Sequence, residues 1–463
     1  MNILKAIEKT FKLILPSPFS IALILTLVSF LLAFFLTDSS HSGFNRFIEI
    51  TGFWEKGLWN SPLLVFAVQM MLMLVLGHTL ALTSPVSKII GCTIKYCTNT
   101  ARSAAIVTFL TVIVSLFNWG LGLIFGAILA RKVGEYANKN NISLNYPLIG
   151  AAGYSGLMVW HGGISGSAPI KAAEEGHIKN LMGEITTPSQ LNLLPESIPF
   201  SETVFGNMNL VMMIVLIICL PLFMFLLGRK NHKKSRLPDF IGANQEKNTK
   251  TYYGAEKMDR SKIFSSFFGL FIITYIIYSV FTTYPEKGLG FINPNFINLL
   301  LLGLCLFIHR NVHSFLGAID RAIGGASGIL IQFPLYFGIM GIMNGSGLID
   351  VFSDFFVSIS NQTTFPIFSF ISAGIVNVFV PSGGGQWGVQ GPIIIKAALD
   401  IGVELPKSIM ALSYGDQLTN MLQPFWALPL LGITGLKAKE ILPYTFSLMC
   451  VGSFLFISIL LLF

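Results

Sequence analysis

Residues 365–398 read FPIFSFISAGIVNVFVPSGGGQWGVQGPIIIKAA, an apolar stretch interrupted near its middle by small and polar residues. The interruption, at 381–388, opens with Pro381 and Ser382 and continues with three glycines, a composition that ends a helix. Non-helical backbone inside a bilayer is tolerated only where protein buries it or where it lines a wet cavity. The stretch therefore predicts a re-entrant helical hairpin over 365–398, and its tip is a candidate functional site.

The composition of the whole chain places this hairpin in a membrane protein. Only 11% of the 463 residues are charged and the mean hydropathy is +0.70, whereas about a quarter of the residues of a soluble domain are charged. Apolar runs of about 20 residues, the length of a spanning helix, recur along the chain. Clear examples are 19–36, 62–82, 210–227, 263–281 and 443–463. The chain is therefore predicted to be an all-α polytopic membrane protein embedded in a lipid bilayer.

Two further features of the composition exclude other classes. The net charge of +8 comes from basic residues gathered in a few loops, which membrane topology explains without nucleic acid. The cysteines lack the spacing of a zinc site or a disulfide framework. We therefore expect no nucleic-acid partner, no metal and no cofactor. The cysteines are Cys92, Cys97, Cys219, Cys305 and Cys450.

Lysine and arginine residues near short loops predict the orientation in the membrane. Lys5, Lys9 and Lys12 place the N-terminus in the cytoplasm, and the basic linker 229–262 is predicted to be cytoplasmic as well. The acidic segment 171–202 is predicted to be external. Counting spans from the linker places both ends of the hairpin 365–398 outside, together with the C-terminus.

A second interrupted stretch lies at 104–130. Arg102 on one side and the Arg131–Lys132 pair on the other are both predicted to be cytoplasmic, and Asn118-Trp119-Gly120 interrupts the stretch near its middle. A re-entrant hairpin over 104–130 reconciles these charges. A single span with one misleading charge is the alternative.

The two hairpins occur at matching places in the chain. Asn118 lies 29 residues before Pro147, and Asn377 lies 29 residues before Pro406. Together with the opposite orientations, this spacing predicts two inverted-topology repeats, 1–228 and 263–463, joined by the linker 229–262. The expected fold has about nine full spans and two hairpins, with a site near the midplane.

After each hairpin comes an apolar span that contains glycine, proline and hydroxyl residues. The span 146–170 contains GYSG and WHGGISGSAP, and the span 407–433 contains SYGDQLTN followed by QP. Glycine and proline at this density predict broken transmembrane helices. The freed helix ends offer unpaired N–H groups and partial positive charge, which favour an anion.

The tips and breaks supply the candidate substrate-binding residues. No Arg or Lys lies in any of them, so helix dipoles, amides and hydroxyls are expected to bind one carboxylate rather than two. Tryptophans beside the breaks are candidates for the wall of an alkyl pocket, although packing is the common role of such residues. The candidates are Asn118, Trp119, Gly162, Gly163, Ser165, Ser167, Ser382, Gly383, Gly384, Gly385, Gln386, Trp387, Gln390 and Asn420, with Trp160 and Trp426 flanking them.

Asp416 is the only carboxylate inside either predicted broken span. An acid buried in a membrane is expensive and is functional by default. It is expected to bind a coupling cation, H⁺ or Na⁺, with Thr419, Asn377 and Ser155 as further ligands. His161 is a candidate proton carrier, and a packed hydrogen-bonding histidine is the equal alternative.

Two motifs resemble a known family. Residues 380–392, VPSGGGQWGVQGP, and residues 160–169, WHGGISGSAP, closely resemble signatures of the bacterial short-chain fatty acid transporters, which include the acetoacetate and butyrate carrier. The resemblance extends over essentially the whole chain. It implies short monocarboxylate substrates, the bacterial inner membrane, and a homodimer in which scaffold helices hold a moving transport domain. Sodium-coupled members of the wider superfamily have Ser-Asn-Thr hairpin tips, which this chain lacks, so the resemblance does not imply sodium coupling.

The expected function is that of a secondary transporter for acetate- to hexanoate-sized acids, including butyrate and acetoacetate. A cation-coupled symport with elevator-type alternating access is the favoured mechanism. A carrier of another organic anion, such as a dicarboxylate or an aminobenzoyl conjugate, and a passive anion channel are the alternatives. An enzyme is disfavoured, because the sequence has neither a His-Glu-x-x-His nor a Gly-x-Ser-x-Gly motif.

Overall fold

The structure is a computed structural model that describes residues 16–182, 194–230, 254, 256–283 and 294–463. Lys5, Lys9 and Lys12, most of the predicted linker 229–262 and part of the acidic segment 171–202 lie outside the described residues. Every regular element within the described ranges is a helix.

Seven helical segments in this part of the chain are long and apolar enough to cross a membrane. This confirms the prediction of an all-helical polytopic membrane protein. Side-chain oxygens at the N-caps Ser17, Asn60, Asn99 and Ser261 each accept a backbone N–H and so fix where four of the helices begin. The segments are α2 (Pro18–Leu36), α4 (Ser61–Ala81), α6 (Thr100–Phe117), α12 (Asn207–Lys230), α14 (Lys262–Thr282), α23 (Ala438–Leu462) and the run from α16 (Val312–Ala322) through η4 (Ile323–Ala326) to α17 (Ser327–Gly345).

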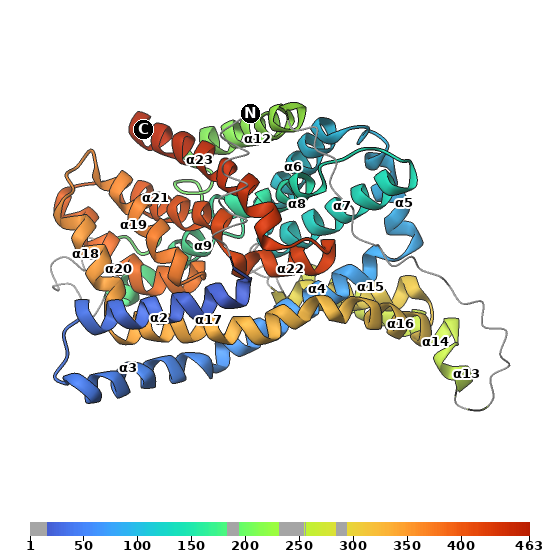
Figure 1. The fold of residues 1–463 in the computed structure, drawn as a ribbon, viewed down its shortest axis with the longest axis horizontal. Coiled ribbons are helices and arrows are strands. Elements are labelled where there is room, and N and C mark those ends of the chain that lie inside the picture. The colour runs from blue at the N-terminus through green and yellow to red at the C-terminus, as the bar shows by residue number, and fades with distance from the viewer. Residues whose placement is uncertain (1–15, 183–193, 231–253, 255, 284–293) are drawn as a thin grey trace.

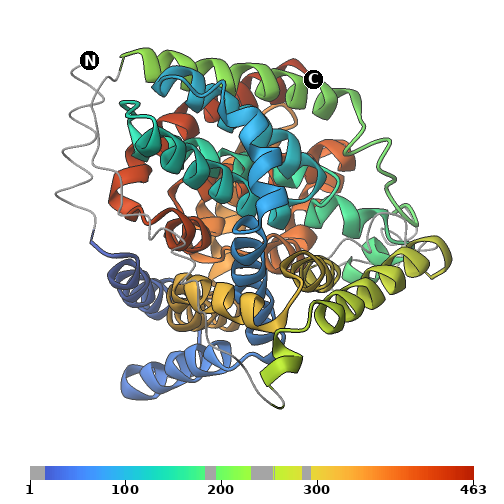
Figure 2. The ribbon, with the colours of Figure 1, turned by 90° about the vertical axis from the view of Figure 1, so that its right-hand side faces the viewer.

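The helices form two groups that touch where α4 and α17 meet α7 (Trp119–Lys139) and α22 (Pro424–Thr434). The first group lies along the lower part of Figure 1, and Figure 2 shows α4 running up against the second group. The first group, here called the framework, contains α2, α3 (Gly43–Leu58), α4 and α14 to α17, with α15 at Pro294–His309. Gly57 of α3 packs so closely on Gly338 and Gly341 of α17 that an added Cβ would lie 2.3–3.0 Å from α17 backbone atoms. Such small-residue contacts are how helices pack without a hydrophobic driving force in a bilayer.

The other group, here called the core group, holds two helix pairs that turn at the predicted tips. In the first pair, α6 ends at Phe117 and α7 (Trp119–Lys139) begins after a single intervening residue, Asn118. An added Cβ at Gly122 would lie 2.0 Å from Ser115 Oγ, and one at Gly126 would lie 2.8 Å from Thr111 Cγ2. As the residue number increases along α7, the contacted residue number decreases along α6. The two helices therefore run antiparallel.

The second pair consists of α19 (Phe365–Phe379) and α20 (Gly383–Ile401). Gln386 Nε2 donates to the carbonyl oxygen of Ala373 at 2.9 Å, and Gln390 Nε2 donates to Ser372 Oγ at 2.8 Å. Here too, a higher residue number on α20 contacts a lower one on α19, so these two helices are also antiparallel. The turn between α19 and α20 therefore places residues 380–382 at the end of an antiparallel pair.

Both predicted broken spans are interrupted helices. In the first, α8 (Tyr146–Tyr154) gives way to η1 (Ser155–Met158) and η2 (Trp160–Gly162) before α9 (Ser167–Ala173) begins. In the second, α21 (Leu405–Thr419) gives way to η5 (Asn420–Leu422), and α22 (Pro424–Thr434) follows. We call η1 through Gly166 the first break, and η5 with Gln423 the second break. The remaining helices are α5 (Ser84–Ile94), α10 (His177–Met182), α13 (Glu256–Asp259) and α18 (Leu348–Ser358).

Candidate functional site

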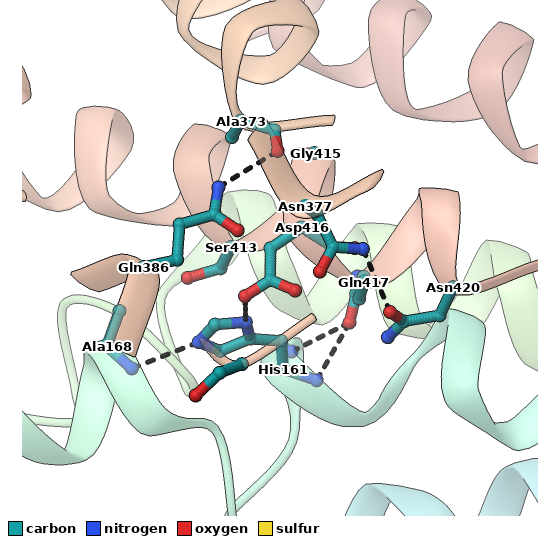
Figure 3. A network of polar contacts seen from close by, with 12 residues as sticks. His161, Ala168, Ala373, Asn377, Gln386, Ser413, Gly415, Asp416, Gln417 and Asn420 are labelled. Atoms are coloured by element: carbon teal, nitrogen blue, oxygen red, sulfur yellow. Dashed lines mark hydrogen bonds and ion pairs between the residues drawn. The ribbon is translucent and has the colours of Figure 1, made fainter. Parts of the chain in front are cut away.

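His161 of the first break and Asp416 of α21 meet in the interior (Figure 3). His161 Nδ1 lies 3.0 Å from Asp416 Oδ2, and the two side chains are 0% and 1% exposed. This distance is that of an ion pair, but the two atoms are not aligned as a hydrogen bond. The pair joins residues that are far apart in the sequence and that belong to the two predicted repeats.

The second ring nitrogen of His161 is also occupied. The backbone N–H of Ala168 donates to His161 Nε2 at 3.0 Å, as Figure 3 shows. The imidazole ring stacks on the indole of Trp160, with ring centroids 4.4 Å apart and an interplanar angle of 16°. The ring is therefore held on one face by Trp160 and at Nε2 by Ala168, while Nδ1 faces the Asp416 carboxylate.

Gln417 holds the first break in place from the other half of the chain. Its Oε1 accepts the backbone N–H of His161 at 2.8 Å and that of Gly162 at 3.2 Å. A break in a buried helix frees backbone N–H groups that must find another partner. The side chain of Gln417 supplies that partner across 256 residues of sequence.

Asn377 holds the second break in a similar way. Its Nδ2 lies 2.8–2.9 Å from the carbonyl oxygen of Asp416, from Thr419 Oγ1 and from Asn420 Oδ1. Gln423 Nε2 donates to the carbonyl oxygen of Asn377 in return. Three of the predicted site residues, Asn377, Thr419 and Asn420, thus form one buried cluster beside Asp416.

The tip between α19 and α20 presents bare backbone to the His161–Asp416 pair. An added Cβ on Gly383 would lie 3.1 Å from Asp416 Oδ2, 3.1 Å from His161 Cε1 and 2.7 Å from Trp160 Cη2. Ser382 caps α20 by accepting the N–H of Gly385 at 3.2 Å. Gly384 faces open space, with Ser167 Oγ as the nearest atom, 4.0 Å from where its Cβ would lie.

The tip between α6 and α7 contacts the first break instead. The N–H of Trp119 donates to Ser165 Oγ at 2.9 Å, and the N–H of Ile164 donates to the carbonyl oxygen of Leu116 at 2.8 Å. Gly163 lies against Leu116, with only 2.3 Å between an added Cβ and the Leu116 carbonyl oxygen. Asn118 caps α7 by accepting the N–H of Leu121.

Three tryptophans near the breaks form an aromatic cluster with Phe66 of the framework. The ring centroid of Trp119 is 6.0 Å from that of Trp160 and 5.2 Å from that of Trp426. Phe66 lies 6.1 Å from both Trp119 and Trp426, and it stacks on Phe333 of α17 at 6.3 Å. This aromatic cluster connects the first tip and both broken helices to α4 and α17.

The structure gives other contacts to four predicted site residues. Trp387 lies outside the aromatic cluster, where its indole N–H donates to His177 Nε2 at 3.1 Å. The side-chain amides of Gln386 and Gln390 donate within the α19–α20 pair, as described above. Ser155 Oγ donates to the carbonyl oxygen of Ala152 at 2.7 Å, within its own helix.

Sequence reasoning missed four polar residues that join the elements of the site. Besides Gln417, these are Tyr154, whose hydroxyl lies 2.8 Å from the carbonyl oxygen of Asn420, and Tyr414, which donates to Asn209 Oδ1 at 2.8 Å. Asn209 Nδ2 donates to the carbonyl oxygen of Gly162 at 2.8 Å. Asn209 and Gln417 could have been found from the sequence, because each is a polar side chain within an apolar run.

Unsatisfied polar atoms gather around the same point. Buried polar groups in native proteins are nearly always hydrogen-bonded, so each exception calls for an explanation. Within the described residues, several exceptions belong to side chains of the interrupted helices and of the α19–α20 pair, which is typical of a site that binds a polar ligand. They include His161 Nδ1, Asp416 Oδ2, Asn377 Oδ1, Gln386 Oε1, Gln417 Nε2, Gln423 Oε1 and Trp160 Nε1.

The fold and the site together define a class. The chain combines seven apolar segments of spanning length with a buried polar site that is built from interrupted helices and helix-pair tips. In membrane proteins, irregular backbone and buried acids at such depth are typical of substrate and ion pathways. These features define a multi-pass membrane transport protein.

The chain belongs to the short-chain fatty acid transporter family, whose model matches residues 2–463. A relative from Haemophilus influenzae is 35% identical over 435 residues, which cover 93% of this chain and 92% of the relative. A relative from Escherichia coli K12 is 34% identical over 447 residues, which cover 96% and 94%. Both relatives are provisionally named short-chain fatty acid transporters. The resemblance of the two sequence motifs is thereby confirmed.

Two solved structures are similar to this chain at 14% identity. The YdaH transporter of Alcanivorax borkumensis has a TM-score of 0.38, with 95% of this chain and 97% of that chain covered. MtrF of Neisseria gonorrhoeae, from a class of antimetabolite efflux pumps, has a TM-score of 0.39, with 97% and 96% covered. At these scores neither structure bears on the fold or the activity of this chain.

Proposed function

We propose that this protein carries short-chain fatty acids, from acetate to hexanoate and including butyrate and acetoacetate, across the bacterial inner membrane together with one proton. The observation that carries the proposal is the position of Asp416. It is the only carboxylate in the two interrupted helices, from α8 through α9 and from α21 through α22, and it contacts the first break and the second tip. The family membership supports the choice of substrate.

The substrate carboxylate binds at the second tip in this proposal. The N–H groups of Gly383 and Gly384 lie at the positive end of α20, where a helix favours an anion. The absence of side chains lets a carboxylate approach this backbone closely. Ser167 and Ser382 supply hydroxyl groups beside it.

The alkyl tail lies against the aromatic cluster. Trp119, Trp160 and Trp426 offer a large apolar surface on the side of the first tip. Burial of one CH₂ group contributes about 0.8 kcal/mol, which corresponds to about a fourfold gain in affinity. A pocket of this kind selects by chain length and has no group for a second charge.

Charge repulsion couples the substrate to the cation. Two carboxylates in one enclosed site cannot both stay ionised without a positive charge between them. Protonation of Asp416 therefore precedes or accompanies the binding of the acid anion. Na⁺ bound by Asp416, Asn377 and Thr419 is the competing possibility, and it is tested separately below.

Transport follows an elevator-type movement in this proposal. The core group, with its two re-entrant hairpins and two broken helices, moves against the framework, which also forms the contact of a homodimer. The two inverted repeats with about nine full spans supply the two matching states. The aromatic cluster, which includes framework residues Phe66 and Phe333, lies on the surface between the two groups.

Uptake of radiolabelled butyrate into proteoliposomes tests the proposal. A pH gradient with the more acidic solution outside the vesicles is expected to drive saturable accumulation of butyrate inside. An imposed Na⁺ gradient is expected to have no effect. Accumulation that follows Na⁺ alone would assign the cation site to sodium. Uptake that never exceeds equilibrium would indicate a channel. Uptake of labelled succinate with no uptake of butyrate would indicate a different organic anion.

A further inference from the structure

We propose that His161 is a positioning residue, locked as a neutral imidazole with its proton on Nδ1, and that it confines the coupling proton to Asp416. This inference rests on the proposed function and assigns the proton-carrying role within the same site. It separates the two candidates that the sequence leaves open, a titrating histidine and a titrating aspartate.

The hydrogen bond at Nε2 determines the tautomer of His161. The backbone N–H of Ala168 donates to Nε2 at 3.0 Å, so Nε2 must present its lone pair. In a neutral imidazole one nitrogen accepts and the other carries the hydrogen. The proton of His161 therefore lies on Nδ1, the nitrogen that faces Asp416 Oδ2 at 3.0 Å.

A second proton on His161 is opposed by the same contact. It would place an Nε2–H group against the Ala168 N–H group, and two donors would face each other in a fully buried position. The ring cannot easily turn away, because it stacks on Trp160 and its Cε1 lies against Gly383. Protonation of His161 thus requires displacement of the first turn of α9, whereas protonation of Asp416 requires no such movement.

The other groups around His161 do not offer a competing charge. Gln417 from α21 holds the backbone of His161, and Asn209 from α12 holds that of Gly162, and both are neutral. On α9 the nearest charged residue along the helix is Lys171, which is exposed and paired with Glu174 at 2.8 Å. Tyr414 donates its hydroxyl proton to Asn209. Asp416 is therefore the only charged side chain in contact with His161 among the described residues.

This arrangement gives the pair a division of roles. The Nδ1–H group of His161 lies 3.0 Å from the Asp416 carboxylate, and a positive dipole end at this distance favours a negative charge there. When the coupling proton arrives, Asp416 accepts it and the imidazole keeps its tautomer and its bond to Ala168. In this proposal His161 positions the carboxylate and Asp416 carries the proton.

Two substitutions test the roles of the two ring nitrogens one at a time. His161→Asn places an amide N–H group near the position of Nδ1 and keeps a donor toward Asp416, but it loses the acceptor for Ala168. His161→Gln reaches the position of Nε2 with an amide oxygen that accepts the Ala168 N–H, but it loses the donor toward Asp416. Neither side chain titrates.

The readout is the pH at which butyrate uptake into proteoliposomes is half-maximal. His161→Asn is expected to keep the wild-type midpoint, with a change confined to KM or to the maximal rate. His161→Gln is expected to move the midpoint to higher pH, because the carboxylate of Asp416 loses the N–H group that lies beside it. If both variants lose their pH dependence, His161 is the carrier and the proposal is overturned. If both keep the wild-type midpoint, His161 only packs the site, and the proposal is overturned as well.

A spectroscopic measurement tests the tautomer without transport. The ¹⁵N NMR signals of His161 are assigned in purified, ¹⁵N-histidine-labelled protein as those that disappear in His161→Gln. They are expected to be those of a neutral ring with its proton on Nδ1. They should not change across the pH range in which uptake changes. A signal that moves to that of a doubly protonated ring in this range would overturn the proposal. Because this measurement needs no substrate, it stands even if the protein transports a different anion.

Discussion

The two tips serve the same site with opposite chemistry. The first tip turns within one residue, Asn118, and then projects the ring of Trp119 into the aromatic cluster. The second tip needs Pro381, Ser382 and three glycines, and Gly383 and Gly384 offer backbone without side chains. In the proposed function, the first tip contacts the tail and the second tip contacts the charge. On that proposal, matching positions of the two predicted repeats bind different parts of one ligand.

The largest expected effect is that of removing the charge beside the second tip. Asp416→Asn keeps the size of the side chain and retains an oxygen that can accept from His161 Nδ1. Because the amide cannot bind a proton, accumulation of butyrate against its gradient is expected to be lost, while exchange of internal for external butyrate continues. Uptake in proteoliposomes with and without a pH gradient measures both. Accumulation with an unchanged pH dependence would refute the role of Asp416.

Filling the second tip is expected to have the next largest effect. The Cβ in Gly383→Ala would lie 2.7 Å from Trp160 Cη2 and 3.1 Å from Asp416 Oδ2. Overpacking of this kind costs about 1–3 kcal/mol, so butyrate affinity should fall by about five- to 150-fold. Gly388→Ala on the same helix is the control, because its Cβ meets nothing within 4 Å. Equal losses in both variants would show that the tip has no special role.

Removing the ring at the first tip should change selectivity more than rate. Trp119→Ala deletes apolar surface, and each CH₂ group of a substrate then loses up to about 0.8 kcal/mol. The preference for butyrate over acetate should fall by up to about 16-fold, measured as the ratio of their inhibition constants for labelled butyrate. Trp387→Phe is the comparison, since Trp387 lies outside the aromatic cluster, and it should leave the ratio unchanged.

The smallest expected effect concerns the bond between the first tip and the first break. Ser165→Ala removes the oxygen that accepts the Trp119 N–H at 2.9 Å. A single hydrogen bond contributes about 0.5–1.5 kcal/mol, so a modest fall in thermal stability with retained selectivity is expected. A thermal unfolding assay in detergent, together with the acetate-to-butyrate ratio, checks both parts. A change in that ratio as large as the one in Trp119→Ala would contradict this ranking.

The sequence predicts local interruptions well, because glycine, proline and polar residues within apolar runs leave few alternatives. The first interruption was predicted at Asn118, where α6 ends and α7 begins. The second was predicted over 381–388, but only 380–382 lie outside a helix, because the glycines 383–385 form the first turn of α20. The helix class and the membrane setting followed from composition alone. Both depend on residues close together in the chain.

The pairing of distant residues could not be predicted in this way. Asp416 and His161 were both candidates, but nothing in either local sequence indicates that they meet at 3.0 Å. Trp387 resembles Trp426 in being a tryptophan beside an interruption, yet it packs on His177, because α10 lies next to α20. Gln417 binds the first break only because that break leaves the backbone N–H group of His161 without a helical partner and close to the Gln417 side chain.

The contact of Gln417 with the first break also has a consequence for biosynthesis. Residue 417 is made 256 residues after residue 161, which at about 5–20 residues per second is a delay of about 10–50 s. During that time the backbone N–H groups of His161 and Gly162 lack the oxygen that later accepts them. Unpaired backbone groups are costly in lipid, so the nascent first half must keep this segment in water or against the insertion machinery. The membrane integration of the first half is therefore complete only when the second half has arrived.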